Sequence, residues 1–253
     1  MDLGLRGLKA VVSGGTKGIG QAVAQTLADE GVNVSICARN ESDVKEAVAA
    51  LQAKGVDAFG SAVDVADGPA LKQWVEASAS RFGGLDIVVA NVSALATRQD
   101  EESWRKCFDV DMMGCVRMVD AAMPWLEKSD AGSIVAISSV SGREIDFAAG
   151  PYGTFKAALV HYVQGLAFRR ASQGIRANTV SPGNTYFPGG VWEQTEQRKP
   201  ELYRSALALN PTGRMGTPQE MANAVAFIAS PAASFISGTN LVVDGALTRG
   251  VQL

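Results

Sequence analysis

Short apolar runs alternate with longer amphipathic stretches along the whole chain. The runs are rich in valine, isoleucine and alanine, which is typical of strands buried on both faces of a sheet. Most of the stretches between them repeat apolar residues at helical spacing. The predicted strands are 8–12, 32–37, 58–63, 86–90, 134–138, 176–180 and 240–243, and the predicted helices lie near 18–30, 41–53, 67–81, 101–127, 152–172 and 218–229.

This alternation predicts an α/β fold. Strands that alternate with helices form right-handed βαβ crossovers, whose strands run parallel. We therefore expect a Rossmann-type doubly wound parallel sheet of about seven strands, flanked by helices on both faces. No linker or low-complexity segment interrupts the pattern, so residues 1–253 are predicted to form a single domain.

Composition and charge narrow the class of partner. The chain has 253 residues, of which 47% are hydrophobic, and this composition is typical of a soluble globular protein. A net charge of −3 provides no basic footprint for nucleic acid, so a small-molecule partner is expected. No apolar run reaches the roughly 18 residues of a membrane span, and the N-terminus lacks the pattern of a secretion signal.

Cysteine and histidine usage also excludes some chemistry. Cys37, Cys107 and Cys115 are an odd number in apolar or helical surroundings, which indicates small hydrophobic side chains with reduced thiols and a cytoplasmic protein. His161 is the single histidine, and no cysteine or carboxylate stands at metal-ligand spacing from it. We expect neither a metal site nor a Ser-His-Asp hydrolase, and we expect His161 to be a packed or interface residue.

A glycine-rich turn, Ser13-Gly-Gly-Thr-Lys-Gly-Ile-Gly20, joins the first predicted strand to the first helix. Gly14 permits a tight turn, Gly18 lets backbone amides approach a pyrophosphate, and Gly20 allows the helix to pack closely on the strand. The turn therefore predicts a dinucleotide site at the helix N-terminus. The other predicted cofactor contacts of this turn are Thr16, Lys17 and Ile19.

Ser139, Tyr152 and Lys156 form a candidate proton-delivery device. Tyr152 and Lys156 are four positions apart, so they share one face of a helix. A free phenol titrates near pH ~10, and a nearby cation stabilises the phenolate and brings a phenol into the neutral range. Ser139 ends a buried strand, where its hydroxyl could bond a carbonyl oxygen as charge builds on it. Because a Tyr-x-x-x-Lys pair is common by chance, its meaning depends on the surrounding motifs.

In this order the motifs resemble those of the classical short-chain dehydrogenase/reductase family. The resemblance covers essentially the whole chain. It rests on Gly14-x-x-x-Gly18-x-Gly20, Asp64-Val65, Asn91, Ser139, Tyr152, Lys156, Pro182-Gly183 and Gly238-Thr-Asn-Leu-Val-Val-Asp244-Gly.

The resemblance implies a carbonyl reductase, an oxidoreductase that interconverts a ketone and a secondary alcohol. Tyr152 would be the catalytic acid in reduction and the base in oxidation, and Ser139 would polarise the substrate oxygen. Lys156 would support the phenolate and bind the nicotinamide ribose. The nicotinamide cofactor would provide the hydride.

The resemblance also implies further contacts to the cofactor. Asp64 would hold the adenine, with Val65 beside it. Asn91 would help to fix the central sheet and the ribose. Pro182 and Gly183 would lie against the nicotinamide.

Charge at the end of the second strand favours NADP(H). Ala38 stands where NAD-dependent relatives commonly carry an acid that binds the adenosine ribose, and Arg39 follows it. Lys17 could converge on the same place. Two cations without a carboxylate suit a 2′-phosphate, although Lys17 and Arg39 could also be ordinary surface charges.

Departures from the family pattern indicate a divergent member. Asp111 stands where the family usually has an asparagine of the proton relay, and its charge would compete for Lys156. Phe187 replaces the threonine expected after Pro182-Gly183, leaving Asn184 or Thr185 to contact the nicotinamide amide. These changes motivate an alternative, a catalytically weak NADP-binding relative with a regulatory or structural role.

Residues 184–211 are predicted to form a variable lid over the substrate. Its aromatic residues indicate either an apolar or ring-bearing ketone or only the apolar face of the lid itself. A 3-oxoacyl-carrier-protein reductase is not favoured, because Lys128, Arg169 and Arg170 are the only cations near the expected carrier surface. The helix from Tyr152 is apolar on more than one face, and with the family resemblance this predicts a homotetramer or homodimer.

Overall fold

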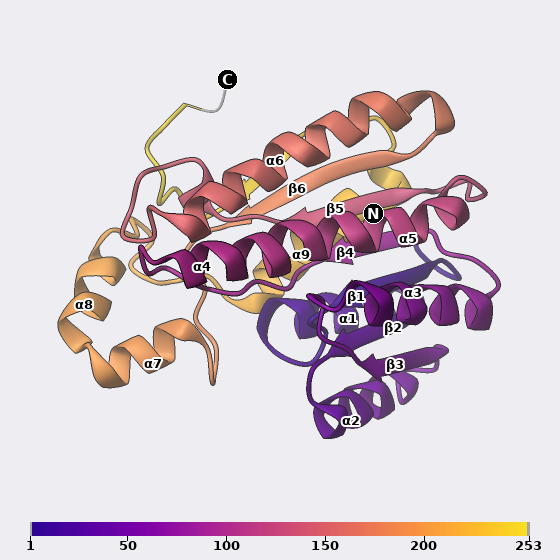
Figure 1. Ribbon diagram of the computed structural model, residues 1–253, viewed down its shortest axis with the longest axis horizontal. Coiled ribbons are helices and arrows are strands. Elements are labelled where there is room, and N and C mark those ends of the chain that lie inside the picture. The colour runs from indigo at the N-terminus through magenta and orange to yellow at the C-terminus, as the bar shows by residue number, and fades with distance from the viewer. Residues whose placement is uncertain (1, 252–253) are drawn as a thin grey trace.

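Seven parallel strands form one sheet in this computed structural model, which describes residues 2–251. The order across the sheet is β3-β2-β1-β4-β5-β6-β7 (Figure 1). The predicted Rossmann-type doubly wound sheet is therefore confirmed. The strands are β1 Lys9–Ser13, β2 Asn33–Ala38, β3 Ala58–Ala62, β4 Ile87–Ala90, β5 Ser133–Ile137, β6 Arg176–Pro182 and β7 Asn240–Val243.

The strand order reverses between β1 and β4. β1 pairs with β2 on one side, where Val11 lies opposite Ser35, and with β4 on the other, where Val11 lies opposite Val88. Connections leave such neighbouring strands in opposite directions, so a crevice opens at their carboxyl ends. The glycine-rich turn follows β1 directly and therefore lies at this crevice.

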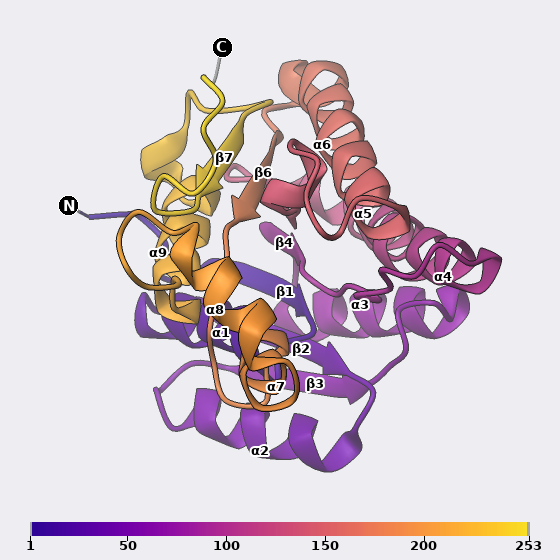
Figure 2. The ribbon, with the colours of Figure 1, turned by 90° about the vertical axis from the view of Figure 1, so that its left-hand side faces the viewer.

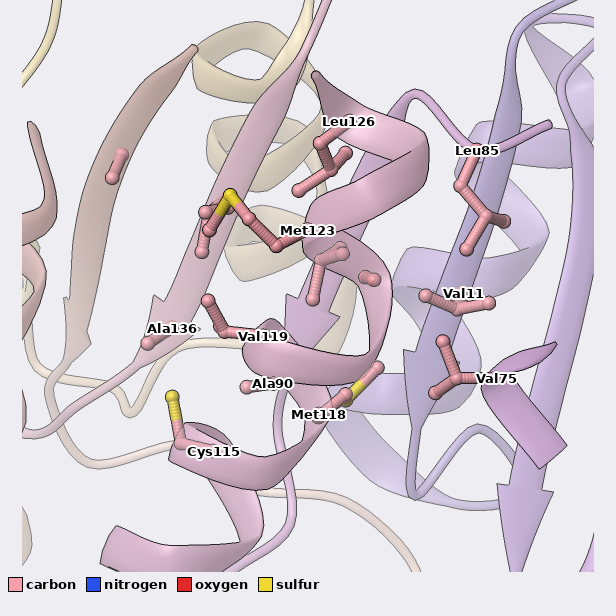
Figure 3. Packing of buried hydrophobic residues seen from close by; sticks show 14 of the residues in the cluster. Val11, Val75, Leu85, Ala90, Cys115, Met118, Val119, Met123, Leu126 and Ala136 are labelled. Carbon is pink, nitrogen blue, oxygen red and sulfur yellow. The ribbon is translucent and has the colours of Figure 1, made fainter. Parts of the chain in front are cut away.

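Helices cover both faces of the sheet, as Figure 2 shows from one end. α1, α2 and α9 cover one face through residues such as Leu27 and Val225, and α3, α5 and α6 cover the other. Figure 3 shows part of the second cluster, in which Val119 of α5 lies beside Ala136 of the sheet and Met118 points toward Val75 of α3. The helices are α1 Gly18–Asp29, α2 Glu41–Gln52, α3 Gly68–Phe82, α5 Gly114–Leu126, α6 Pro151–Arg170 and α9 Pro218–Ala229.

α1 and α9 pack against each other although they come from opposite ends of the chain. The Gln219 side-chain amide donates to the Thr26 hydroxyl across this contact at 2.8 Å. Thr217 and Glu220 form a capping box at the start of α9, in which each side chain accepts from the other's backbone N–H. This contact closes the layer of helices on its face of the sheet.

The predicted helix near 101–127 is helical without a break over 101–126, but its hydrogen-bond pattern changes along its length. The stretch 101–127 is divided into α4 Glu101–Lys106, a π-helix over Cys107–Met113, and α5. A π-helix closes i→i+5 hydrogen bonds, so it holds more residues per turn than an α-helix. Gly114 stands where the π-helix passes into α5, but no glycine or proline stands where the π-helix begins, and the apolar spacing on either side continues to indicate a helix.

The 184–211 segment forms two helices that the sequence pattern did not predict, α7 Val191–Arg198 and α8 Pro200–Ala208. They follow the carboxyl end of β6 and lie beside the sheet rather than on either face (Figures 1 and 2). Trp192, Ala206 and Met215 form their own small core. Among residues 2–251, no helix combines the length and the apolar character needed to cross a bilayer.

Candidate active site

Ser139 follows β5 at the carboxyl edge of the sheet. Its side chain is buried, and its Oγ accepts a hydrogen bond from the Ser141 backbone N–H at 3.2 Å. The neighbouring Ser138 Oγ donates to the carbonyl of Lys156 at 2.8 Å. This bond ties the end of the strand to α6, which carries the next two predicted residues.

Tyr152 is the second residue of α6 and Lys156 lies one turn further on. Pro151 precedes Tyr152 at the first helical position, where its missing N–H costs nothing. The Lys156 Nζ lies 5.7 Å from the centroid of the Tyr152 ring. Tyr152 is half-buried, and its hydroxyl forms no hydrogen bond with any group of residues 2–251. The phenol is therefore held beside a cation and remains free to bond another molecule.

Lys156 is almost fully buried, with 2% of its surface exposed. Its Nζ donates to the Ile137 carbonyl at 2.9 Å and lies 3.2 Å from the Asp111 Oδ1. An ammonium taken out of water needs such partners, because its desolvation costs several kcal/mol. The two contacts fix the position of the cation beneath Tyr152.

Asp111 reaches Lys156 from the π-helix. Its Oδ2 accepts from the Ala94 N–H at 2.9 Å, while its Oδ1 has no hydrogen bond of acceptable angle despite the short distance to Lys156. The contact is an ion pair, because Coulomb attraction depends on the distance between the charges and not on linear geometry. A cavity of about 10 Å³ beside Asp111, also lined by Ser13, has room for one water molecule.

The glycine turn is tightly packed around its three predicted glycines. Gly14 and Gly18 have φ of +69° and +55°, a region that favours glycine. A Cβ on Gly20 would lie 2.2 Å from the Gly14 carbonyl oxygen, so the helix could not approach the strand with any larger residue. Asn91 follows β4 and donates from Nδ2 to the Ser13 carbonyl at 3.0 Å, which joins the two strands at the crevice.

The start of α1 fits an anion. Lys17 occupies the N-cap position but makes no side-chain cap, and no side chain of residues 2–251 satisfies the N–H groups of the first turn, which begins with Gly18 and Ile19. Those groups and the helix dipole favour negative charge. Thr16 is half-buried beside them. The residues present therefore fit the pyrophosphate of a dinucleotide.

The structure adds a carboxylate to the predicted 2′-phosphate site. Ala38 ends β2 and Arg39 is exposed beyond it. The Lys17 Nζ lies 2.9 Å from Asp43 Oδ2, in the first turn of α2. Asn40 caps that helix by accepting from the backbone N–H groups of Ser42 and Asp43. Asp43 was not predicted as part of this site, because an acid in the first turn of a helix is common for its interaction with the helix N-terminus alone.

The other predicted cofactor residues also lie at strand ends. Asp64, two residues beyond β3, is exposed and accepts from the Ala66 N–H at 3.0 Å. Val65 is buried, and its side chain would touch a Cβ on Gly114 at 3.2 Å. Pro182 ends β6, and Gly183 donates to the Val243 carbonyl at 3.0 Å. These positions lie along the carboxyl edge of the sheet.

Aromatic side chains of the 184–211 segment mainly pack within it. Tyr186 and Tyr203 form an edge-to-face pair with centroids 6.1 Å apart. The Tyr186 hydroxyl donates to Glu196 at 2.7 Å, and this bond raises the pKa of Tyr186 to about 12. Trp192 is buried in the small core of the segment. Of the two interpretations of the lid aromatics, packing of its own apolar face accounts for these three residues.

Two aromatic residues nevertheless connect this segment to the site. Phe147, from the loop between Ser139 and Tyr152, contacts Trp192 with centroids 5.6 Å apart. The Phe187 ring lies against Gly18 of the glycine turn. Both contacts join segments far apart in the sequence, so no local pattern could have predicted them.

The three cysteines are free and buried. Burial raises the pKa of Cys37 and Cys115 to about 12, and burial followed by the charge of Asp111 raises the pKa of Cys107 to about 11. His161 is exposed on α6, so it is not packed within the chain. Within the described part of the chain, no three His, Cys, Asp or Glu side chains are grouped as metal ligands.

Comparison with known proteins shows the family to which the chain belongs. The family model described as enoyl-(acyl carrier protein) reductase matches residues 14–248. Isoepoxydon dehydrogenase of Penicillium expansum is 41% identical over 257 residues, which cover 100% of this chain and 99% of that protein. A relative of this identity and coverage shares the family of the chain.

Solved structures agree. L-Sorbose reductase from Gluconobacter frateurii, complexed with NADPH and L-sorbose, has a TM-score of 0.91 and 29% identity, covering 99% of this chain and 100% of that chain. A 7α-hydroxysteroid dehydrogenase complexed with NADH and 7-oxo glycochenodeoxycholic acid has a TM-score of 0.90 and 28% identity, covering 97% and 96%. The chain thus belongs to the short-chain dehydrogenase/reductase family and is an NAD(P)-dependent oxidoreductase that acts on alcohol and ketone groups.

Proposed function

We propose that the chain uses NADPH to interconvert a ketone and a secondary alcohol, with Tyr152 as the general acid and base. The observation that carries this proposal is the placement of Tyr152 above a buried ammonium. The Lys156 Nζ is 5.7 Å from the ring, and the phenol hydroxyl has no hydrogen bond within residues 2–251. A fixed cation stabilises the phenolate, which favours transfer of a proton from and to the phenol.

In the proposed reaction, the hydroxyl groups of Tyr152 and Ser139 both act on the substrate oxygen. The nicotinamide cofactor supplies a hydride in reduction and accepts one in oxidation. In reduction the Tyr152 hydroxyl donates its proton to the substrate oxygen, and in oxidation the phenolate takes that proton back. The Ser139 hydroxyl bonds the same oxygen and stabilises the charge that develops there.

We further propose that the glycine turn and the strand ends hold the cofactor. The amides of Gly18, Ile19 and Gly20 would bond the pyrophosphate, since no side chain caps them. The roles suggested by the family for Gly14, Thr16, Asp64, Val65, Asn91, Pro182 and Gly183 are retained as part of this proposal.

The proposed preference for NADPH depends on Arg39 and Lys17. Asp43 would compete with a 2′-phosphate for Lys17, because the Lys17 Nζ already lies 2.9 Å from the Asp43 carboxylate. Lys17 is 75% exposed, and exposed pairs contribute at most about 1 kcal/mol, so a phosphate can replace Asp43 as its partner. Charge-assisted bonds to phosphate are the stronger ones.

Replacing Tyr152 with Phe tests the proposed role of the phenol. Loss of the proton donor should reduce kcat by at least about 100-fold, while the dissociation constant for NADPH stays within about twofold of the wild-type value. Tyr203→Phe is the control, because it removes a phenol from the 184–211 segment and should leave kcat unchanged. Turnover retained by Tyr152→Phe would remove Tyr152 from the mechanism.

Replacing Arg39 with Ala tests the cofactor preference. Loss of charge-assisted bonds to a 2′-phosphate should lower kcat/KM for NADPH about 10- to 100-fold and leave the value for NADH nearly unchanged. Lys45→Ala, which removes an exposed cation of the neighbouring helix α2, is the control. Equal kcat/KM values of the wild type with NADPH and NADH would contradict the preference.

A second candidate is a catalytically weak NADP-binding relative with a regulatory or structural role. The Asp111 carboxylate beside Lys156 favours it, because a negative charge there weakens the effect of the cation on the phenol. A panel of carbonyl compounds that includes L-sorbose and a 7-oxo bile acid separates the two candidates. Tight NADPH binding without turnover of any member would favour the second.

A 3-oxoacyl-carrier-protein reductase remains the less favoured activity. Among the cations near the expected carrier surface, Arg170 pairs with Glu127 at 3.1 Å and Lys128 lies over the Trp125 ring. Both are already engaged within the chain, which reduces the charge available to an acidic carrier.

A further inference from the structure

The ring of Phe187 lies directly on the glycine turn. A Cβ placed on Gly18 would lie 2.5 Å from Phe187 Cζ and 2.7 Å from Cε2, far inside van der Waals contact. The ring can therefore rest there only because residue 18 has no side chain. Gly18 also opens α1, so the ring touches the place where the helix presents its unpaired amides.

The turn that carries Phe187 is firmly held. Gly190 donates to the Phe187 carbonyl at 3.0 Å, and Gly189, with φ of +76°, donates to the Glu193 carboxylate at 2.7 Å. A Cβ on Gly190 would lie 3.0 Å from the same ring. The phenyl group is thus enclosed between Gly18 and Gly190, and α7 anchors the turn behind it.

The polar side chains that precede Phe187 are engaged elsewhere. The Thr185 hydroxyl is buried and donates to the Gly183 carbonyl at 3.1 Å, and the Asn184 amide points to the Ala206 carbonyl at 3.5 Å. This part of the segment therefore presents a hydrocarbon surface to the start of α1.

We propose that Phe187 is an apolar cover of the pyrophosphate site and limits the rate of cofactor exchange. The inference rests on the proposed binding of a dinucleotide at α1. A ring over the site excludes water from the amide–phosphate bonds, which strengthens them in a lower dielectric. The ring must move away from Gly18 before the pyrophosphate can leave, so it slows dissociation.

Dissociation of NADPH from Phe187→Ala and Phe187→Thr tests the cover. NADPH fluorescence, followed by stopped flow after addition of excess NADP⁺, should show a dissociation rate about tenfold above that of the wild type for both variants. Phe187→Leu retains an apolar side chain and should stay within about threefold of the wild type. Circular dichroism verifies that each variant is folded, and this series needs no turnover.

Two control variants, Tyr203→Ala and Phe147→Ala, distinguish loss of the Phe187 cover from a general loosening of the 184–211 segment as the cause of faster dissociation. Each removes an aromatic contact of that segment without touching Gly18. Both should leave the NADPH dissociation rate near the wild-type value. An equal increase in these controls, or no increase in Phe187→Ala and Phe187→Thr, would overturn the inference. Failure of the wild type to bind NADPH or NADH would instead overturn the proposed function.

Discussion

Lys156 and Asp111 form a buried pair with two opposing effects on the site. Asp111 offsets the cost of burying the ammonium, which an uncharged asparagine could do only through its dipole. Its negative charge also cancels part of the field that Lys156 exerts on Tyr152. Asp111 therefore stabilises the buried cation and at the same time weakens the positive field at Tyr152.

Replacing Asp111 with Asn should shift the pH dependence of alcohol oxidation. Without the carboxylate, the field of Lys156 acts fully on the Tyr152 phenolate, so kcat/KM for alcohol oxidation should rise several-fold at the acidic end of the profile. The measurement is kcat/KM for an alcohol found in the carbonyl panel, between pH 6 and pH ~10. Asp109→Asn, on the same π-helix but exposed, is the control. An unchanged profile would mean that the charge of Asp111 does not reach the phenol.

Residues of the site could be predicted where the chain carries a local signal. Tyr152 and Lys156 stand one helical turn apart, and the strand pattern put Ser139 at the correct edge of the sheet. Asp43, Phe147 and the position of Phe187 carry no such signal. Their contacts join loops whose separation in sequence says nothing about their distance in space.

At the scale of elements, the π-helix is the feature that carries Asp111 to its contact with Lys156. The wider turn of Cys107–Met113 lies between two α-helices and brings Asp111 to Lys156, while α5 keeps Val119 on the sheet. Apolar periodicity could predict a helix over this stretch. It could not locate the change of hydrogen-bond pattern, because the apolar spacing on each side is that of an ordinary helix.

Replacing Thr217 with Ala tests the cap of α9. The side chain of Thr217 accepts from the Glu220 N–H, and its loss should lower the free energy of unfolding by about 1 kcal/mol and Tm by roughly 2–4 °C at pH ~7. Asn223→Ala, exposed on the same helix, should leave Tm nearly unchanged. A Tm of Thr217→Ala equal to that of the wild type would show that the cap contributes nothing.

The same cap is sensitive to acid. Hydrogen bonds from Arg214, then from the Thr217 backbone, lower the pKa of Glu220 to about 2. Its folded value is below its unfolded value of 4.5, so its contribution to stability is complete above that pH. The contribution is lost as the pH falls from there toward 2.

At the scale of the whole molecule, the sheet was the easiest part to predict. Parallel strands buried on both faces are continuous apolar runs, and each predicted strand overlaps an observed one. Helices α7 and α8 were not predicted, since their segment is polar with scattered aromatic residues and is stabilised by a core of its own. The single domain over 1–253 and the cytoplasmic location remain predictions.

Light scattering tests the predicted homotetramer or homodimer. Trp104, Phe108 and Phe155 form an aromatic cluster on α4 to α6, where Phe108 is 47% exposed, and Phe168 is 88% exposed further along α6. We expect a mass two or four times that of the chain, and Phe108→Glu should reduce it, because a charge would be buried in the contact. A monomeric wild type would contradict this expectation.

The packing of α1 on α9 also has a consequence for synthesis, because the ribosome makes α1 long before it makes α9. Thr26 and its partner Gln219 are 193 positions apart, so at typical translation rates α1 waits roughly 10–40 s for the helix that covers it. During that time the nascent chain exposes apolar side chains such as Val23 and Leu27, which are fully buried in the finished protein. The first half of the chain therefore cannot complete the packing of α1 until α9 emerges.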